Sequence, residues 1–92
     1  MEYKKLGNTG LEVSSLCLGT MAFGRWIDEK TSQDVFDAAI DTGITLFDTA
    51  DIYGRGMDNK NPLDSGESEV ILGRIMKEKR KDIIVATKVN GR

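Results

Sequence analysis

The sequence predicts an α/β fold with a parallel sheet, preceded by a β-hairpin. Short apolar runs alternate along the chain with stretches of helical periodicity, which is the pattern of strand–helix–strand units joined by right-handed crossovers. Three of the apolar runs end near residues 19, 48 and 88. Ligands and reacting groups collect at the carboxyl ends of strands in such folds, so these three positions mark the predicted site.

The composition limits the chain to one small globular domain and excludes several classes of partner. It has 92 residues, 39% of them hydrophobic and 30% charged, which is ordinary for a folded domain. The net charge is −2 and the charges are scattered, so neither a nucleic-acid nor a membrane partner is expected. One cysteine and no histidine exclude an internal disulfide and a Cys/His metal site, and we expect a cytoplasmic protein without a metal.

The first elements are a hairpin and a buried strand. Tyr3–Leu6 and Leu11–Val13 flank the stretch GNTG, whose glycines and asparagine tolerate the positive φ angles of a tight turn. Leu16–Leu18 is a short continuous apolar run that ends at Gly19 and Thr20. Such a run is typical of a parallel strand that is covered on both faces.

A helix and a second strand follow. Asp28 can act as the N-cap of the helix and Gly43 as its end. Ile44–Thr49 gives the second strand. The predicted apolar face of the helix consists of Val35, Ala38, Ala39 and Thr42.

The last third of the chain is predicted as loop, helix and strand. Residues 50–65 are rich in Gly, Asp and Asn and contain Pro62, so they are expected to form a long loop. Ser65 or Gly66 opens a helix, and Ile83–Lys88 is the third strand, with a turn at Asn90–Gly91. The helix has acidic residues at its start, basic residues 77–81 at its end, and an apolar face formed by Ile71, Leu72, Ile75 and Met76.

Three strands and two helices are fewer than a closed barrel requires, since a (β/α)8 barrel has eight units in about 250 residues. The chain is therefore expected to be the first part of a longer polypeptide, truncated after the third barrel strand. On their own, these residues would leave two sheet edges unpaired, which favours aggregation.

The stretch LFDTADIYG, residues 46–54, contains the strongest candidates for chemistry. Neighbouring strands lie about 4.8 Å apart, so Asp48 can form an ion pair with Lys88 if the second and third strands are adjacent. Tyr53 can then fold back over the pair. A nearby ammonium favours the phenolate, which suits a tyrosine that donates a proton. The alternative is a structural ion pair with a half-buried tyrosine, and the spacing does not decide between the two.

Other candidate motifs are weaker. The stretch GTMAFG, residues 19–24, lacks the Lys and Ser/Thr of a phosphate-binding P-loop, and no G-x-G-x-x-G follows a strand. Asp48 and Asp51 do not flank a bond from two sides as a glycosidase pair does, so Asp51 is predicted to be a solvated loop acid. Lys88 could form a Schiff base, although a lysine paired with a carboxylate is a poor nucleophile.

Three further residues have structural interpretations. Cys17 lies in the middle of a strand and is predicted to be a small core residue. Phe23 and Trp26 either pack the loop or form the apolar wall of a substrate pocket.

The chain contains four spaced motifs, LGNTGLEVSSLCLGTM (6–21), FDTADIYG (47–54), GESEVILGR (66–74) and IIVATKV (83–89). Together they resemble the aldo-keto reductase family over essentially the whole chain. That family has a (β/α)8 TIM barrel whose bottom is closed by an N-terminal hairpin, and it reduces aldehydes and ketones with NADPH. The resemblance implies that residues 1–92 are the N-terminal part of one such barrel domain.

The resemblance also implies roles for individual residues. Asp48, Tyr53 and Lys88 match the catalytic aspartate, tyrosine acid and lysine of the family. Gly19, Thr20 and Met21 match the loop beside the nicotinamide, which Asp48 also approaches. A fourth catalytic residue, a histidine, has no counterpart here, because the family places it after the next strand, beyond the last residue of this chain.

The implied substrate is a small carbonyl compound, and the oligomeric state stays open. Two alternatives remain: a cofactor-binding regulatory module resembling the β-subunits of ion channels, and an inactive structural fragment.

Overall fold

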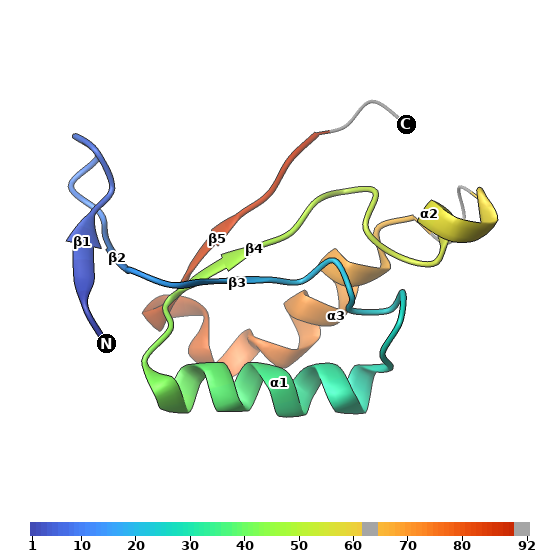
Figure 1. Cartoon of the computed structure of the whole chain (residues 1–92), viewed down its shortest axis with the longest axis horizontal. Coiled ribbons are helices and arrows are strands. Elements are labelled where there is room, and N and C mark those ends of the chain that lie inside the picture. Colours follow the sequence, from blue (N-terminus) through green and yellow to red (C-terminus); the bar gives the residue numbers. More distant parts are fainter. Residues whose placement is uncertain (62–64, 90–92) are drawn as a thin grey trace.

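The computed structural model describes residues 1–61 and 65–89. Within these residues, a hairpin precedes a parallel sheet that is covered on one face by helices (Figure 1). The hairpin pairs β1 (Tyr3–Lys5) with β2 (Glu12–Ser14), and the sheet has the order β3 (Cys17–Gly19), β4 (Leu46–Asp48), β5 (Ile84–Ala86). This order and the parallel direction confirm the predicted fold class and the predicted adjacency of the strands.

The two faces of the sheet differ because side chains alternate along each strand. Leu18, Phe47 and Val85 lie opposite one another in register and pack into the core below the sheet. Asp48 lies opposite Gly19 and Ala86 in the next row, on the face that no described helix covers. The site residues therefore project away from the core.

Helix α1 (Glu29–Thr42) begins and ends where the sequence predicts. The backbone N–H of Thr31 donates to the carboxylate of Asp28 over 2.8 Å, and this bond lowers the pKa of Asp28. At the other end, Gly43 has φ 97°, a left-handed conformation that a residue with a Cβ adopts only under strain. These two residues fix the length of α1.

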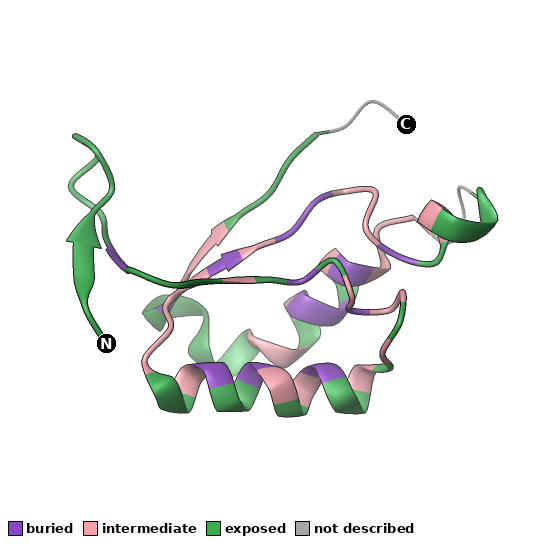
Figure 2. Cartoon of the chain, viewed as in Figure 1, coloured by how far each residue is buried: buried purple, intermediate pink, exposed green. Residues whose placement is uncertain are grey.

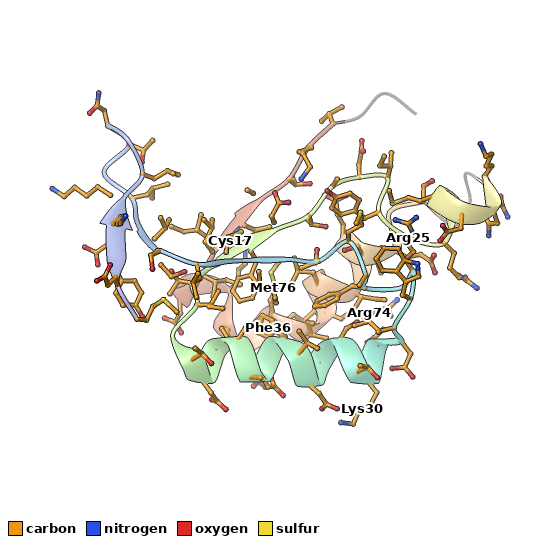
Figure 3. All side chains as sticks on the ribbon, viewed as in Figure 1. Cys17, Arg25, Lys30, Phe36, Arg74 and Met76 are labelled. Carbon is orange, nitrogen blue, oxygen red and sulfur yellow. The ribbon has the colours of Figure 1, made fainter. Side chains whose placement is uncertain are left out.

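The predicted apolar face of α1 is partly wrong. The helix buries Ser32, Phe36 and Ala39, whereas Ala38 and Thr42 are exposed. The face is set by Phe36, whose ring stacks on Phe47 with the ring centroids 5.0 Å apart. Burying an aromatic ring outweighs burying small side chains, because the hydrophobic free energy grows with the area removed from water. Figure 3 shows Phe36 pointing from α1 towards the strands and Lys30 pointing away.

Helix α3 (Glu67–Ile75) has the predicted apolar face, with Ile71 and Leu72 buried in the core and Ile75 and Met76 packed against it. The basic residues that follow, predicted as the end of this helix, instead form a 3-10 helix over Lys77–Asp82. Figure 2 shows the buried residues on the sides of α1 and α3 that are turned to the sheet. No helix within the described residues is long and apolar enough to cross a membrane.

The predicted long loop after β4 contains a short helix, α2 (Gly56–Asn59). The helix ends at Lys60, whose positive φ of 59° places it in the left-handed region. Pro62 and the predicted turn at Asn90–Gly91 lie outside the described residues.

Cys17 is exposed, so its prediction as a core residue is wrong. It lies opposite Leu46, one residue before Leu18, and alternation therefore turns it to the uncovered face of the sheet. The partial burial that remains raises the pKa of its thiol, with a smaller contribution from the negative charge of Asp48.

The hairpin is fastened at the amino ends of the strands. The backbone N–H of Ser14 donates to Thr45 Oγ1 over 3.0 Å, and the N–H of Thr45 donates to Ser14 Oγ over 2.9 Å. The hydroxyl of Tyr3 donates to the carbonyl of Gly43 over 2.8 Å. The hairpin thus lies at the opposite end of the sheet from α2 and the loops that follow β3 and β4 (Figure 1).

Two glycine substitutions are expected to change stability in opposite directions. Gly43→Ala adds a Cβ at positive φ, 2.9 Å from Tyr3 Oη, and is expected to lower the free energy of unfolding by about 1 kcal/mol or more. Gly73→Ala adds a Cβ inside α3 with nothing within 4 Å, and is expected to raise it by roughly 0.5–1 kcal/mol. Urea unfolding of both variants measures the two effects. Changes of the same sign would contradict either the strained backbone of Gly43 or the helical position of Gly73.

Candidate active site

The ends of β4 and β5 stay paired beyond the regular strands. The N–H of Thr49 donates to the carbonyl of Ala86 over 2.8 Å, and the N–H of Asp51 donates to the carbonyl of Lys88 over 3.2 Å. Asp48 is the last residue of β4, and Lys88 lies two residues beyond β5. The parallel pairing therefore carries both side chains to the same edge of the sheet.

Asp48 and Lys88 form the ion pair that the sequence predicts. Lys88 Nζ donates to the two carboxylate oxygens of Asp48 over 3.0 and 2.9 Å, and to the carbonyl of Thr49 over 2.9 Å. The side chains are 43% and 37% exposed for Lys88 and Asp48. The pair is thus held by three contacts yet is open to a molecule approaching the uncovered face.

Tyr53 folds back over the pair, as predicted. The Nζ atom of Lys88 lies 5.0 Å from the centroid of the Tyr53 ring, within the range of a cation–π contact. Two hydrogen bonds hold the backbone of Tyr53. Its N–H donates to Ala50 O over 3.3 Å, and its carbonyl accepts the N–H of Ser68 over 3.0 Å. The three residues therefore form one cluster at the carboxyl edge of the sheet.

The hydrogen bond with Asp48 raises the pKa of Lys88, and Tyr53 adds to the effect, while partial burial opposes it. A raised pKa means that the folded protein holds this proton more tightly than the unfolded chain does. Its contribution to stability is complete below the ordinary lysine pKa and is lost as the pH rises through the raised value. Lys88 is therefore charged at neutral pH, which makes it a poor Schiff-base nucleophile.

The residues that end and follow β3 differ in their exposure. A Cβ at Gly19 would meet nothing within 4 Å, and Met21 is exposed. The hydroxyl of Thr20 is fully buried and donates to the carbonyl of Asp48 over 2.9 Å. The space around Gly19, which lies opposite Asp48 in the strand register, is therefore open, whereas the Thr20 side chain supports the Asp48 backbone from beneath. The described residues contain no group of three or more His, Cys, Asp or Glu side chains suited to a metal ion.

An ion pair joins the loop after β3 to α2. Arg25, labelled in Figure 3, donates two hydrogen bonds of 2.8 Å to the carboxylate of Asp58, which raises the pKa of Arg25 and lowers that of Asp58. The guanidinium also lies 4.2 Å from the centroid of the Trp26 ring. This pair could not be predicted, because its partners are 33 residues apart and, unlike Asp48 and Lys88, do not lie at the ends of adjacent strands.

The two aromatic residues of this loop have different environments. Phe23 is 2% exposed and belongs to the core, while Trp26 is 61% exposed. Of the two interpretations left open by the sequence, loop packing holds for Phe23, and Trp26 remains available as part of a pocket wall.

Comparison with known proteins points to one family. The family model described as the aldo/keto reductase family matches residues 15–92. The uncharacterized oxidoreductase YrpG of Bacillus subtilis is 50% identical over 92 residues, which cover 97% of this chain and 26% of that protein. The aldo-keto reductase YhdN of the same organism is 46% identical over 94 residues, which cover 96% and 25%.

A solved structure gives the same result for the fold. The holo form of the aldo-keto reductase AKR11C1 from Bacillus halodurans is similar with a TM-score of 0.80 and 36% identity, over 100% of this chain and 27% of that one. The chain spans about a quarter of the length of the curated relatives it matches. Its hairpin and parallel strands correspond to part of the barrel of such enzymes.

Proposed function

The chain belongs to the aldo/keto reductase family, and on this premise we propose that it forms the N-terminal part of the barrel domain of an oxidoreductase. The proposed reaction is the reduction of an aldehyde or ketone to an alcohol, with NADPH as the hydride donor. The observation that carries this proposal is the cluster of Asp48, Tyr53 and Lys88 at the carboxyl edge of the sheet.

Tyr53 is the proposed general acid. Its hydroxyl would give a proton to the carbonyl oxygen, and the negative charge that this leaves on the phenolic oxygen would be attracted by the positive charge of Lys88, whose Nζ lies 5.0 Å from the ring centroid. Asp48 holds that ammonium in place through two hydrogen bonds. The raised pKa of Lys88 keeps the charge present throughout the neutral range.

The nicotinamide end of the cofactor would lie on the open side of the site. Support for this comes from Gly19, which lies opposite Asp48 and has nothing within 4 Å of its Cβ position, and from the exposure of Met21. The Asp48 carboxylate can accept hydrogen bonds from ribose hydroxyls. Thr20 would contribute by holding the Asp48 backbone, because its own hydroxyl is already engaged. When bound, NADPH supplies the hydride, and the preference for NADPH over NADH follows from the family resemblance.

The test is steady-state turnover of the full-length protein. Oxidation of NADPH is followed by absorbance with a panel of aldehydes and ketones, and NADH is compared under the same conditions. Carbonyl-dependent oxidation is the expected result. Tight NADPH binding without carbonyl-dependent turnover would overturn the proposal in favour of a regulatory, cofactor-binding module.

A further inference from the structure

Three buried hydroxyl groups lie beneath the candidate active site. Thr20 follows β3, Thr49 follows β4, and Ser68 lies in the first turn of α3. Their exposed fractions are 0%, 2% and 0%. The chain thus brings a hydroxyl from three separate segments to one point directly under the strand ends.

Ser68 is the centre of this group. Its hydroxyl donates to the carbonyl of Thr20 over 2.6 Å, and its Oγ lies 2.9 Å from Thr20 Oγ1 and 3.2 Å from Thr49 Oγ1. Each hydroxyl has a single hydrogen to donate. Because the Ser68 hydroxyl donates to the Thr20 carbonyl, the hydroxyl of Thr49 is the donor in its bond with Ser68 Oγ. Removing the Ser68 oxygen would take away the acceptor of the Thr49 hydroxyl and one of the two donors to the Thr20 carbonyl, the other being the backbone N–H of Phe23.

The same serine is connected to all three site residues, directly to Tyr53 and through one threonine each to Asp48 and Lys88. Its backbone N–H donates to the carbonyl of Tyr53 over 3.0 Å. Thr20 Oγ1 donates to the carbonyl of Asp48 over 2.9 Å. The carbonyl of Thr49 accepts the Nζ of Lys88 over 2.9 Å.

The environment of Ser68 is unlike that of an ordinary serine at a helix start. The residue in the N-cap position is Gly66, and the hydroxyl of Ser68 bonds outside its own helix. The neighbouring side chains of the same turn also bind segments that lead to the site. Glu67 accepts the backbone N–H of Arg55 over 2.7 Å, and Glu69 accepts the hydroxyl of Thr87 over 2.6 Å.

We propose that Ser68 is a positioning residue, which sets the relative placement of Asp48, Tyr53 and Lys88 through Thr20, Thr49 and its own backbone. The reaction that it supports is the one proposed above, so the inference rests in part on that function. Placement matters because a displacement of about 1 Å can slow a reaction by as much as roughly 100-fold.

The first test compares turnover in matched variants of the full-length protein. Ser68→Ala and Thr49→Val are expected to lower kcat/KM by roughly 10- to 100-fold, and Thr49→Ser, which keeps the hydroxyl, is expected to restore most of the activity. Ser32→Ala is the control, because Ser32 is equally buried but donates to Asp28 O at the start of α1. Equal loss in Ser68→Ala and Ser32→Ala, or in Thr49→Val and Thr49→Ser, would overturn the proposal.

The second test does not depend on reductase activity. The rate at which acetic anhydride labels Lys88 is measured as a function of pH by peptide mass spectrometry. The midpoint is expected to fall towards that of an ordinary lysine in Ser68→Ala and Thr49→Val and to stay in place in Ser32→Ala. An unchanged midpoint in both of the former would overturn the positioning role, even if the wild-type protein reduces no carbonyl. A shifted midpoint in a protein without turnover would support the positioning role and count against the proposed reaction alone.

Discussion

Replacement of Tyr53 by phenylalanine is expected to lower kcat by roughly 10²- to 10⁴-fold, which is the usual contribution of a general acid. The variant removes only the transferable proton and the phenolic oxygen. The ring remains to pack over Lys88, and the backbone bonds to Ala50 and Ser68 remain. NADPH affinity, measured by fluorescence titration, is therefore expected to stay nearly unchanged.

The matched control is Tyr3→Phe. Tyr3 is the other of the two tyrosines in the chain, and its hydroxyl donates to Gly43 O at the opposite end of the sheet. Its loss is expected to leave kcat unchanged. Wild-type turnover in Tyr53→Phe would remove Tyr53 from the proposed mechanism.

Lys88→Met is expected to lower kcat by roughly 10²- to 10³-fold, as loss of a fixed electrostatic stabiliser does in other active sites. Methionine preserves the length of the side chain but removes the positive charge beside Tyr53. It also leaves Asp48 without its partner. Turnover at saturating NADPH and substrate measures the effect.

Lys30→Met is the control for Lys88→Met, since Lys30 also forms an ion pair with an aspartate, Asp34, four residues along α1. Its loss is expected to leave kcat unchanged.

Borohydride treatment of the wild-type protein with a carbonyl substrate is expected to leave no adduct on Lys88. A trapped adduct would instead indicate an aldolase.

The sheet and the ion pair could be predicted because both follow from the regular geometry of strands and of the crossovers between them. Alternation of side chains puts Asp48 and Phe47 on opposite faces, and short crossovers place consecutive strands side by side. The environment of Cys17 was predicted wrongly because the continuous apolar run Leu16–Leu18 predicts a strand covered on both faces, whereas no described helix covers the face on which Cys17 lies. The face of α1 was misjudged for a related reason, since the partner ring of Phe36 lies on a strand.

The supporting contacts of the site could not be predicted from sequence. Ser68 and Thr20 are 48 residues apart, and Arg25 and Asp58 are 33 residues apart. A serine in the first turn of a helix and a charged residue in a loop are common in any protein. Their significance appears only when the fold brings the partners together.

The order of the parallel strands also has a consequence for the synthesis of the protein. β3, β4 and β5 lie side by side in the order in which the ribosome delivers them, so each new strand can add to an edge that already exists. Phe36 and Phe47 can stack as soon as β4 has emerged. Asp48 receives its partner only with Lys88, 40 residues later, and we expect the cluster of Asp48, Tyr53 and Lys88 to be completed on a core that has formed before it.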